Sequence, residues 1–287
     1  MTSLDNPAFV RLLRPSCVAV LIILSLGTSA WAAETDELAS HRAVYELSLA
    51  QSRGSSTVGA RGRILYDFSG SACEGYALQF RQVSEMDNGE GRVTLSDLRT
   101  TTWEDSGGKT FVFKSENYLN QSLIESVEGR AERLPDKVVV KLLKPVEKTL
   151  ELDATTAFPT DHMRRIIAAG RAGKSILEVP VYDGSEKGER IYQTLSVIGR
   201  TIAPNERPPS DAEPGHKALA GLERWPVTVS YFDKASSGGD QSPIYAIKFE
   251  VYGNGVSRAL VLDYNDFSIR GDLTSLDMRE TRPCNGG

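Results

Sequence analysis

Short segments in which apolar and polar residues alternate recur along almost the whole chain, each bounded by glycine, proline or aspartate. Residues 41–50, for example, place Ala43, Tyr45, Leu47 and Leu49 on one face. A period of two predicts β-strands, because successive side chains point to opposite faces of a sheet. We predict such strands at residues 41–50, 61–68, 75–83, 92–103, 110–114, 122–130, 137–143, 148–152, 175–182, 190–198, 225–232, 244–252 and 256–264. Their regular spacing favours a mainly β fold built as one continuous antiparallel meander.

One segment has helical periodicity instead. In residues 158–170, the side chains of Met163, Ile166 and Ile167 fall at helical spacing. Thr160 is the expected N-cap, since a hydroxyl at that position accepts a hydrogen bond from the first turn. We therefore expect one short helix, laid with its apolar stripe against the curved sheet.

Two connections stand out. Asn254 and Gly255 separate the strands predicted at 244–252 and 256–264, and this pair is typical of a two-residue type I′ turn, in which both residues have positive φ. Residues 203–217 are rich in proline and charge, which predicts an exposed, flexible loop with no apolar anchor.

The first residues have the pattern of a secretory signal peptide. Arg11 and Arg14 precede an apolar run at 18–24, and small residues follow at 29–33. The run is too short to span a bilayer core of about 30 Å as a helix. We therefore predict a signal peptide at residues 1–32.

The mature chain is then expected to be a single β domain at residues 33–287, located in the periplasm. No long apolar run follows the signal, so no transmembrane anchor is predicted in the mature protein. The absence of a cysteine just after the apolar run argues against a lipid anchor. The formal net charge of −5 argues against nucleic acid as a partner.

The cysteines support export. Cys17 lies in the predicted signal peptide, which leaves Cys73 and Cys284 in the mature chain. Two thiols in an oxidising compartment favour one disulfide over two buried free thiols. The bridge would close a loop of about 210 residues. By chain-entropy arguments, such a bridge stabilises the folded protein by at most roughly 5 kcal/mol.

Few residues carry a recognisable chemistry. The chain has three histidines, His41, His162 and His216, too scattered to predict a metal site, and it has no nucleophile or phosphate-binding motif. We predict no catalytic, cofactor-binding or metal-binding residue and no cofactor. The weaker alternative is a hydrolase that uses His162 or acids at strand ends, namely Asp97, Glu104, Asp105, Asp183 and Glu186.

The aromatic side chains are better explained by packing than by a cofactor site. Those in question are Tyr45, Phe80, Trp103, Phe113, Tyr231 and Tyr245. They are expected to fill the core of the sheet, although a strongly curved sheet can also leave an apolar concavity that holds a lipid chain.

Several segments together resemble the cell-envelope integrity protein EipB family. They are residues 41–50, 72–76 with 80–82, 97–100 with 102–105, 158–162, 225–233 and 252–260. The resemblance covers essentially the whole mature chain. It implies a periplasmic β-spiral, one sheet wound into a cup similar to that of periplasmic lipoprotein carriers. It also places the disulfide at Cys73 and Cys284, and it supplies no catalytic residue.

Three functions follow as hypotheses. The first is a non-enzymatic factor that supports envelope integrity by binding a periplasmic protein or an envelope component. The second is a carrier that holds the acyl chain of a lipid or lipoprotein in the cup. The third is the envelope hydrolase. An enclosed apolar concavity favours the carrier, whereas convergent carboxylates or a histidine with a shifted pKa in a cleft favour the enzyme.

Overall fold

The computed structural model describes residues 37–54, 57–204, 206–207, 211, 216–233 and 242–280. The predicted signal peptide lies outside the described residues, which form fourteen strands, two α-helices and one 3-10 helix. In chain order these are β1 (His41–Ser52), β2 (Gly59–Ser71), β3 (Gly75–Asp87), β4 (Val93–Glu104), β5 (Thr110–Leu119), β6 (Ser122–Arg133), β7 (Lys137–Lys144), β8 (Lys148–Asp153), α1 (Pro159–Arg171), β9 (Ile176–Val181), η1 (Glu186–Gly188), β10 (Tyr192–Ile198), α2 (His216–Leu219), β11 (Arg224–Asp233), β12 (Tyr245–Tyr252), β13 (Ser257–Tyr264) and β14 (Phe267–Met278).

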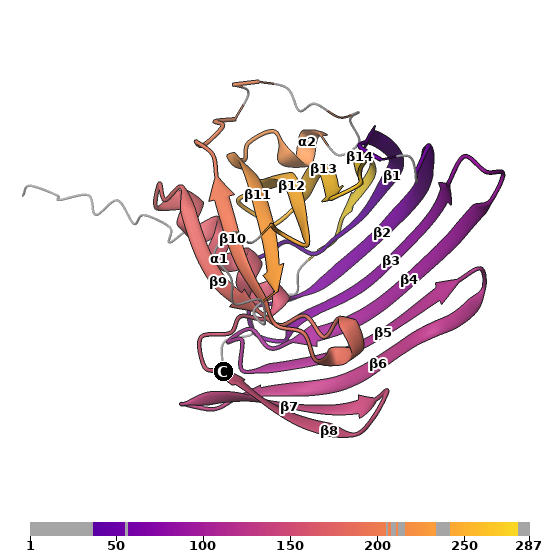
Figure 1. Cartoon of the computed structure of the whole chain (residues 1–287). Coiled ribbons are helices and arrows are strands. Elements are labelled where there is room, and N and C mark those ends of the chain that lie inside the picture. Colours follow the sequence, from indigo (N-terminus) through magenta and orange to yellow (C-terminus); the bar gives the residue numbers. More distant parts are fainter. Residues whose placement is uncertain are drawn as a thin grey trace, which may run out of the picture. The chain divides into compact units, whose positions relative to one another are not determined.

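The strands form one antiparallel sheet, as predicted, in the order β8-β7-β6-β5-β4-β3-β2-β1-β14-β13-β12-β11-β10-β9 (Figure 1). It consists of two meanders joined where β1 pairs with β14. The edge strands are β8 and β9, and the chain passes from one to the other through α1. Just before α1, the N–H of Ala157 donates to the carbonyl of Pro180 in β9 at 2.7 Å. The sheet thus curls around an interior without closing into a barrel.

The prediction of a single meander in chain order is therefore wrong, and β14 is the strand that it omitted. β14 has the small residue Gly271 at its centre, opposite Leu47 of β1, and charged residues on either side of it. Apolar and polar residues alternate only weakly in β14, so the strand is hard to recognise from its own sequence. Its position is determined by β1, which needs a partner on its second edge.

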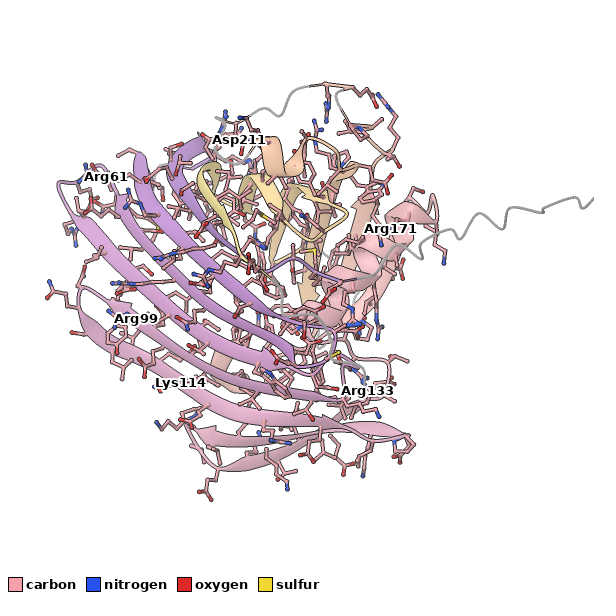
Figure 2. All side chains as sticks on the ribbon, turned by 180° about the vertical axis from the view of Figure 1, so that it is seen from behind. Arg61, Arg99, Lys114, Arg133, Arg171 and Asp211 are labelled. Carbon is pink, nitrogen blue, oxygen red and sulfur yellow. The ribbon has the colours of Figure 1, made fainter. Side chains whose placement is uncertain are left out.

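The two faces of the β1–β6 region differ in chemistry, as strand alternation requires. Inward-facing residues are mostly apolar, whereas the outward face carries ion pairs both between strands and within a strand; Arg61, Arg99 and Lys114, which take part in them, are labelled in Figure 2. Arg61 pairs with Glu85 on β3 at 2.5 Å. Exposed pairs of this kind contribute about 0–1 kcal/mol each, so we attribute the stability of this region to the inner face.

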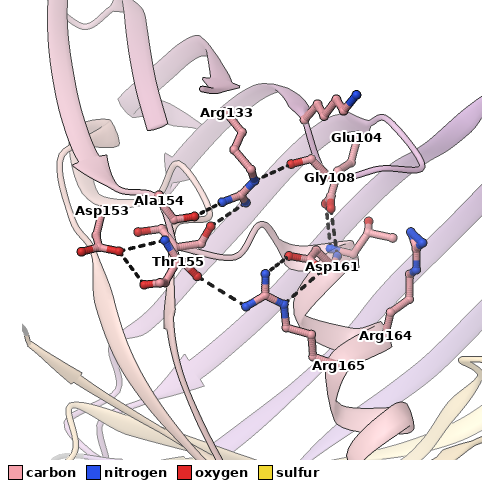
Figure 3. Close-up of polar contacts among 12 residues, drawn as sticks. Glu104, Gly108, Arg133, Asp153, Ala154, Thr155, Asp161, Arg164 and Arg165 are labelled. Carbon is pink, nitrogen blue, oxygen red and sulfur yellow. Dashed lines mark hydrogen bonds and ion pairs between the residues drawn. The ribbon is translucent and has the colours of Figure 1, made fainter. Parts of the chain in front are cut away.

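Helix α1 is present as predicted, but it begins at Pro159, two residues earlier than a Thr160 cap implies, and its cap comes from another element. Phe158 occupies the N-cap position and makes no side-chain capping hydrogen bond, so the prediction of Thr160 as the cap is wrong. Instead, Glu104 at the end of β4 accepts hydrogen bonds from the backbone N–H groups of Thr160 at 2.8 Å and Asp161 at 2.9 Å (Figure 3). A carboxylate at a helix N-terminus also interacts favourably with the helix dipole. The cap therefore ties α1 to the sheet.

Glu104 should give the protein a pH-dependent stability. Burial raises the pKa of Glu104 to about 7 from 4.5, although the N–H groups of Thr160 and Asp161 oppose the shift. The folded carboxyl thus holds its proton more tightly than the unfolded one. Its contribution to stability is fully present below the unfolded pKa and is lost as the pH rises through about 7, a loss of about 3 kcal/mol.

We expect Glu104→Gln to flatten this dependence, because an amide does not titrate. Urea denaturation of both proteins at about pH 5 and about pH 8 measures it. Glu85→Gln, which changes a carboxyl on the outer face, is the control and should keep the wild-type slope. Parallel pH profiles for the wild type and Glu104→Gln would contradict the assignment.

The hairpin between β12 and β13 is present, but its turn is not the type I′ that was predicted. Gly255 has φ of +88°, whereas Asn254 is not among the residues with positive φ. The N–H of Gly255 donates to the carbonyl of Tyr252, and the N–H of Tyr252 donates to the carbonyl of Val256, both at 2.9 Å. These bonds enclose a three-residue loop, Gly253 to Gly255, whose last residue is left-handed.

The loop at 203–217 is anchored at two of its described residues, so it is not simply exposed. Asp211 pairs with Arg258 of β13 at 2.5 Å, and both side chains are fully buried. Arg207 donates to Glu250 at 2.7 Å. The anchors are ionic rather than apolar, which is why hydrophobic patterning did not reveal them.

Cys73 lies in the tight turn between β2 and β3, where the hydroxyl of Ser71 accepts its backbone N–H at 3.3 Å. Cys284 lies outside the described residues. The bridge between Cys73 and Cys284 stays a prediction, which labelling of free thiols in the non-reduced protein tests.

Candidate functional site

A partly open cavity of about 500 Å³ lies within the curled sheet. Strands β1 to β4 line one side, β11 to β13 line the other, and α1 contributes residues between them (Figure 1). The apolar lining comprises Leu38, Tyr45, Ile64, Tyr66, Phe68, Leu78, Phe80, Leu98, Met163, Ile166, Val181, Val229, Ile247, Phe249, Leu260 and Leu262. The volume falls in the range of about 300–1,000 Å³ that small-molecule sites occupy.

The lining arises from strand register. Val229, Ile247 and Leu262 are direct neighbours across β11, β12 and β13, so their side chains share the inner face. On the other wall, Gln82 of β3 pairs with Leu98 of β4. Each strand supplies every second residue, and the curvature of the sheet brings these rows around one interior.

A smaller set of polar groups also faces the cavity. It includes His41, Thr160, His162, Asp183 and the tyrosines Tyr231, Tyr245 and Tyr264. Burial raises the pKa of the Asp183 carboxyl, and the nearby Glu186 adds to the shift, against hydrogen bonds from Ser185. The site is thus a mainly apolar cavity with a few placed polar groups.

The two histidines described with their side chains are buried. His162 is 5% exposed, and its Nε2 lies 3.3 Å from the hydroxyl oxygen of Thr194. Burial lowers the pKa of His162 to about 4 and also lowers that of His41, so both rings are neutral at neutral pH. The side chain of His216 lies outside the described residues.

The acids considered for hydrolysis are dispersed. Asp97 lies on the outer face, where Arg81 and Arg99 both bind it, and the hydrogen bond from Arg81 is the main reason its pKa falls to about 2. Glu104 caps α1. Asp105 accepts backbone N–H groups of the turn before β5.

Asp183 is therefore the one acid of that group that lines the apolar cavity. Glu186 belongs to a separate, open and charged depression of about 850 Å³ between β6 and η1. That depression is lined by Glu125, Glu186, Lys187, Glu189, Arg190, Ile191 and Asp233. Within the described part of the chain, no group of three or more metal-ligating side chains is present.

The aromatic residues divide between core and cavity. Tyr45, Phe80, Tyr231 and Tyr245 line the cavity, Phe113 is buried in the core between β5 and β8, and Trp103 is partly exposed. Sequence reasoning assigned all of them to packing. The expectation is wrong for Trp103, which is 38% exposed because it points to the outer face of β4. For the others, strand alternation predicts the inner face but carries no information on whether that face is filled.

No helix within the described ranges is long and apolar enough to cross a membrane.

Three comparisons relate this chain to known proteins. The model of the EipB-like family matches residues 32–280. The cell envelope integrity protein EipB of Brucella abortus (strain 2308) is 38% identical over 275 residues, which cover 95% of this chain and 96% of that protein. A crystal structure of a beta-barrel-like protein of domain of unknown function DUF1849, also from Brucella abortus, is similar with a TM-score of 0.77 and 39% identity. The similarity covers 85% of this chain and 99% of that one.

Proposed function

This chain belongs to the EipB-like family, and from this premise we propose that it supports the integrity of the bacterial cell envelope by binding an apolar envelope component in its interior cavity. The family relative in Brucella abortus is named for envelope integrity. The proposed compartment is the periplasm, because residues 1–32 have the pattern of an export signal. The proposed action is binding, without a chemical step.

The observation that carries the proposal is the cavity itself. Protein interiors are normally packed to the density of organic crystals, so a space of about 500 Å³ lined by apolar side chains is an unusual feature. An apolar ligand there gains about 0.8 kcal/mol for each methylene group removed from water. Only part of this gain becomes affinity, because binding also restricts the ligand.

This cavity favours the carrier hypothesis over a purely protein-binding factor. The chemistry that it recognises is a hydrocarbon chain, which either a lipid or a lipoprotein acyl group supplies. The hydrolase hypothesis has less support, because His162 contacts Thr194, Asp97 is bound by arginines on the outer face and Glu104 caps α1.

We expect the apolar fluorescent probe N-phenyl-1-naphthylamine to bind the protein, and Ile247→Trp to weaken that binding by at least about tenfold. Ile247 lines the cavity, so a larger side chain there occupies the space of the ligand. Val197→Trp, which adds the same bulk at an exposed position on β10, should bind the probe like the wild type. Fluorescence titration of the three proteins measures the difference.

Native mass spectrometry of protein isolated from the periplasm provides the complementary test. A retained lipid or acylated species that Ile247→Trp lacks supports the proposal. Failure of the probe to bind, together with ligand-free protein from the cell, would overturn it.

A further inference from the structure

The cavity has one chemically distinct end, formed by a row of tyrosines. Tyr231, Tyr245 and Tyr264 are direct neighbours across β11, β12 and β13. The rings of Tyr231 and Tyr245 stack with centroids 4.4 Å apart and planes 15° apart. Tyr264 continues the row, with its ring centroid 6.3 Å from that of Tyr245. All three line the cavity, so the row offers a continuous aromatic surface to whatever occupies it.

The hydroxyl groups of this row are available to a ligand. Within the described residues, no protein group hydrogen-bonds to the hydroxyls of Tyr231, Tyr245 or Tyr264. Buried tyrosine hydroxyls normally have a partner. Their position on a cavity wall means that a bound molecule can provide it.

Asp183 lies at the same end of the cavity. The ring of Tyr192 lies 5.5 Å from that of Tyr231 and 5.9 Å from that of Tyr245, between centroids, and its hydroxyl lies 3.2 Å from the hydroxyl of Ser185, two residues after Asp183. Asp183 lines the same cavity as the tyrosines, and its charge raises the pKa of Tyr231 and of Tyr245 after the larger effect of burial. The backbone N–H of Ser185 donates to Asp183 Oδ1 at 2.9 Å. In the described part of the chain, no cationic side chain forms an ion pair with Asp183.

Arg190, seven residues after Asp183 in the chain, pairs with other acids. Arg190 pairs with Glu186 at 3.0 Å and with Asp233 at 3.7 Å, and its guanidinium lies over the ring of Tyr192 at 6.0 Å. Apart from Ser185, the described side chains that interact with Asp183 are therefore aromatic or acidic. An ionised carboxyl in such a place is costly unless a cation accompanies it.

We propose that Asp183 and the row Tyr231, Tyr245 and Tyr264 bind the protonated amine head of an amphiphile whose hydrocarbon chain fills the rest of the cavity. The inference rests on the proposed function and adds the class of ligand. An ammonium group satisfies both features at once, because it pairs with a carboxylate and is attracted to the faces of aromatic rings. An anionic head is opposed by Asp183, and a neutral alcohol uses only the tyrosine hydroxyls.

The test compares three amphiphiles with the same alkyl chain, dodecylamine, 1-dodecanol and dodecanoate, in displacing N-phenyl-1-naphthylamine at neutral pH. We expect dodecylamine to bind about tenfold more tightly than 1-dodecanol, and dodecanoate to bind more weakly than both. In Asp183→Asn, which keeps the size of the side chain, dodecylamine should lose this advantage while 1-dodecanol binds as before. Equal affinity of the amine and the alcohol for the wild type would overturn the proposal.

Variants of Tyr245 separate the ring from the hydroxyl. Tyr245→Phe keeps the aromatic face and should retain the preference for the amine, whereas Tyr245→Leu should reduce it. A preference that survives both Asp183→Asn and Tyr245→Leu would contradict the assigned site. If none of the three amphiphiles displaces the probe, the proposed function itself fails, whereas equal displacement by all three rejects only the ammonium site.

Discussion

Asp211→Ala is expected to lower the free energy of unfolding by about 3–5 kcal/mol, because it removes the carboxylate that pairs with the buried guanidinium of Arg258. The two side chains are fully buried, and Arg258 Nε lies 2.5 Å from Asp211 Oδ1. The other carboxylate oxygen accepts backbone N–H groups from Ala259 at 3.1 Å and Leu273 at 3.0 Å. The substitution leaves these buried donors without their acceptor, which adds to the loss.

The position of Asp211 explains why the effect should be large. The pairing of β13 with β14 extends from Asp263 to Leu260 and stops there. Asp211 joins Ala259 of β13 to Leu273 of β14 immediately beyond that point, so its carboxylate replaces ladder hydrogen bonds where the strands separate. Asp211 is labelled above this part of the sheet in Figure 2.

Urea denaturation of Asp211→Ala measures the loss. Glu85→Ala is the matched control, because it breaks the exposed pair with Arg61 and should change stability by only about 0–1 kcal/mol. An Asp211→Ala protein as stable as this control would show that the buried pair does not hold the two strands together.

Ile166→Ala is the second substitution with a large expected effect, a loss of about 2–5 kcal/mol. Ile166 is 2% exposed and belongs to the cluster that packs α1 against Trp225 and Phe68. Removing its methyl groups enlarges the neighbouring cavity and loosens the helix that covers it. Ile176→Ala, at a position that is 58% exposed, is the control and should be nearly neutral.

His162→Ala discriminates between binding and catalysis at the same helix. If the protein acts by binding, this variant should lose less stability than Ile166→Ala and should still complement a strain that lacks the protein. If His162 were a catalytic base, the variant would fold normally and yet fail to complement. Complementation with the protein level monitored separates these outcomes, and an abundant, folded His162→Ala protein without function would make us abandon the non-enzymatic proposal.

The candidate site was partly visible in the sequence. Alternation placed Tyr231 and Tyr245 on an inner face, and Asp183 was recognised as an acid at a strand end. Periodicity reports which face of a strand is buried, but it does not report whether the opposite wall of a curved sheet reaches it. The cavity, and the meeting of Asp183 with the tyrosine row, depend on curvature and on the path of the chain between β9 and η1.

The conformations of two turns were also not predictable from local sequence. The pair Asn254 and Gly255 has the composition of a type I′ turn but forms a three-residue loop. Asn120 and Gln121, with φ of 49° and 70°, adopt left-handed conformations in the two-residue connection between β5 and β6. There Asn120 exchanges two hydrogen bonds with the backbone of Leu95 on β4, so a neighbouring strand stabilises a turn whose second residue, Gln121, rarely has positive φ.

By itself, the sequence determined the mainly β class, thirteen of the strands and the one long helix, because each follows from a local period of apolar residues. Tertiary structure alone decided the partner of β1, the cap of α1 by Glu104 and the burial of Asp211 against Arg258. The physical reason is the same in each case. These contacts satisfy backbone hydrogen-bonding groups or buried charges with residues that lie far away in the chain, and no local pattern records such a partner.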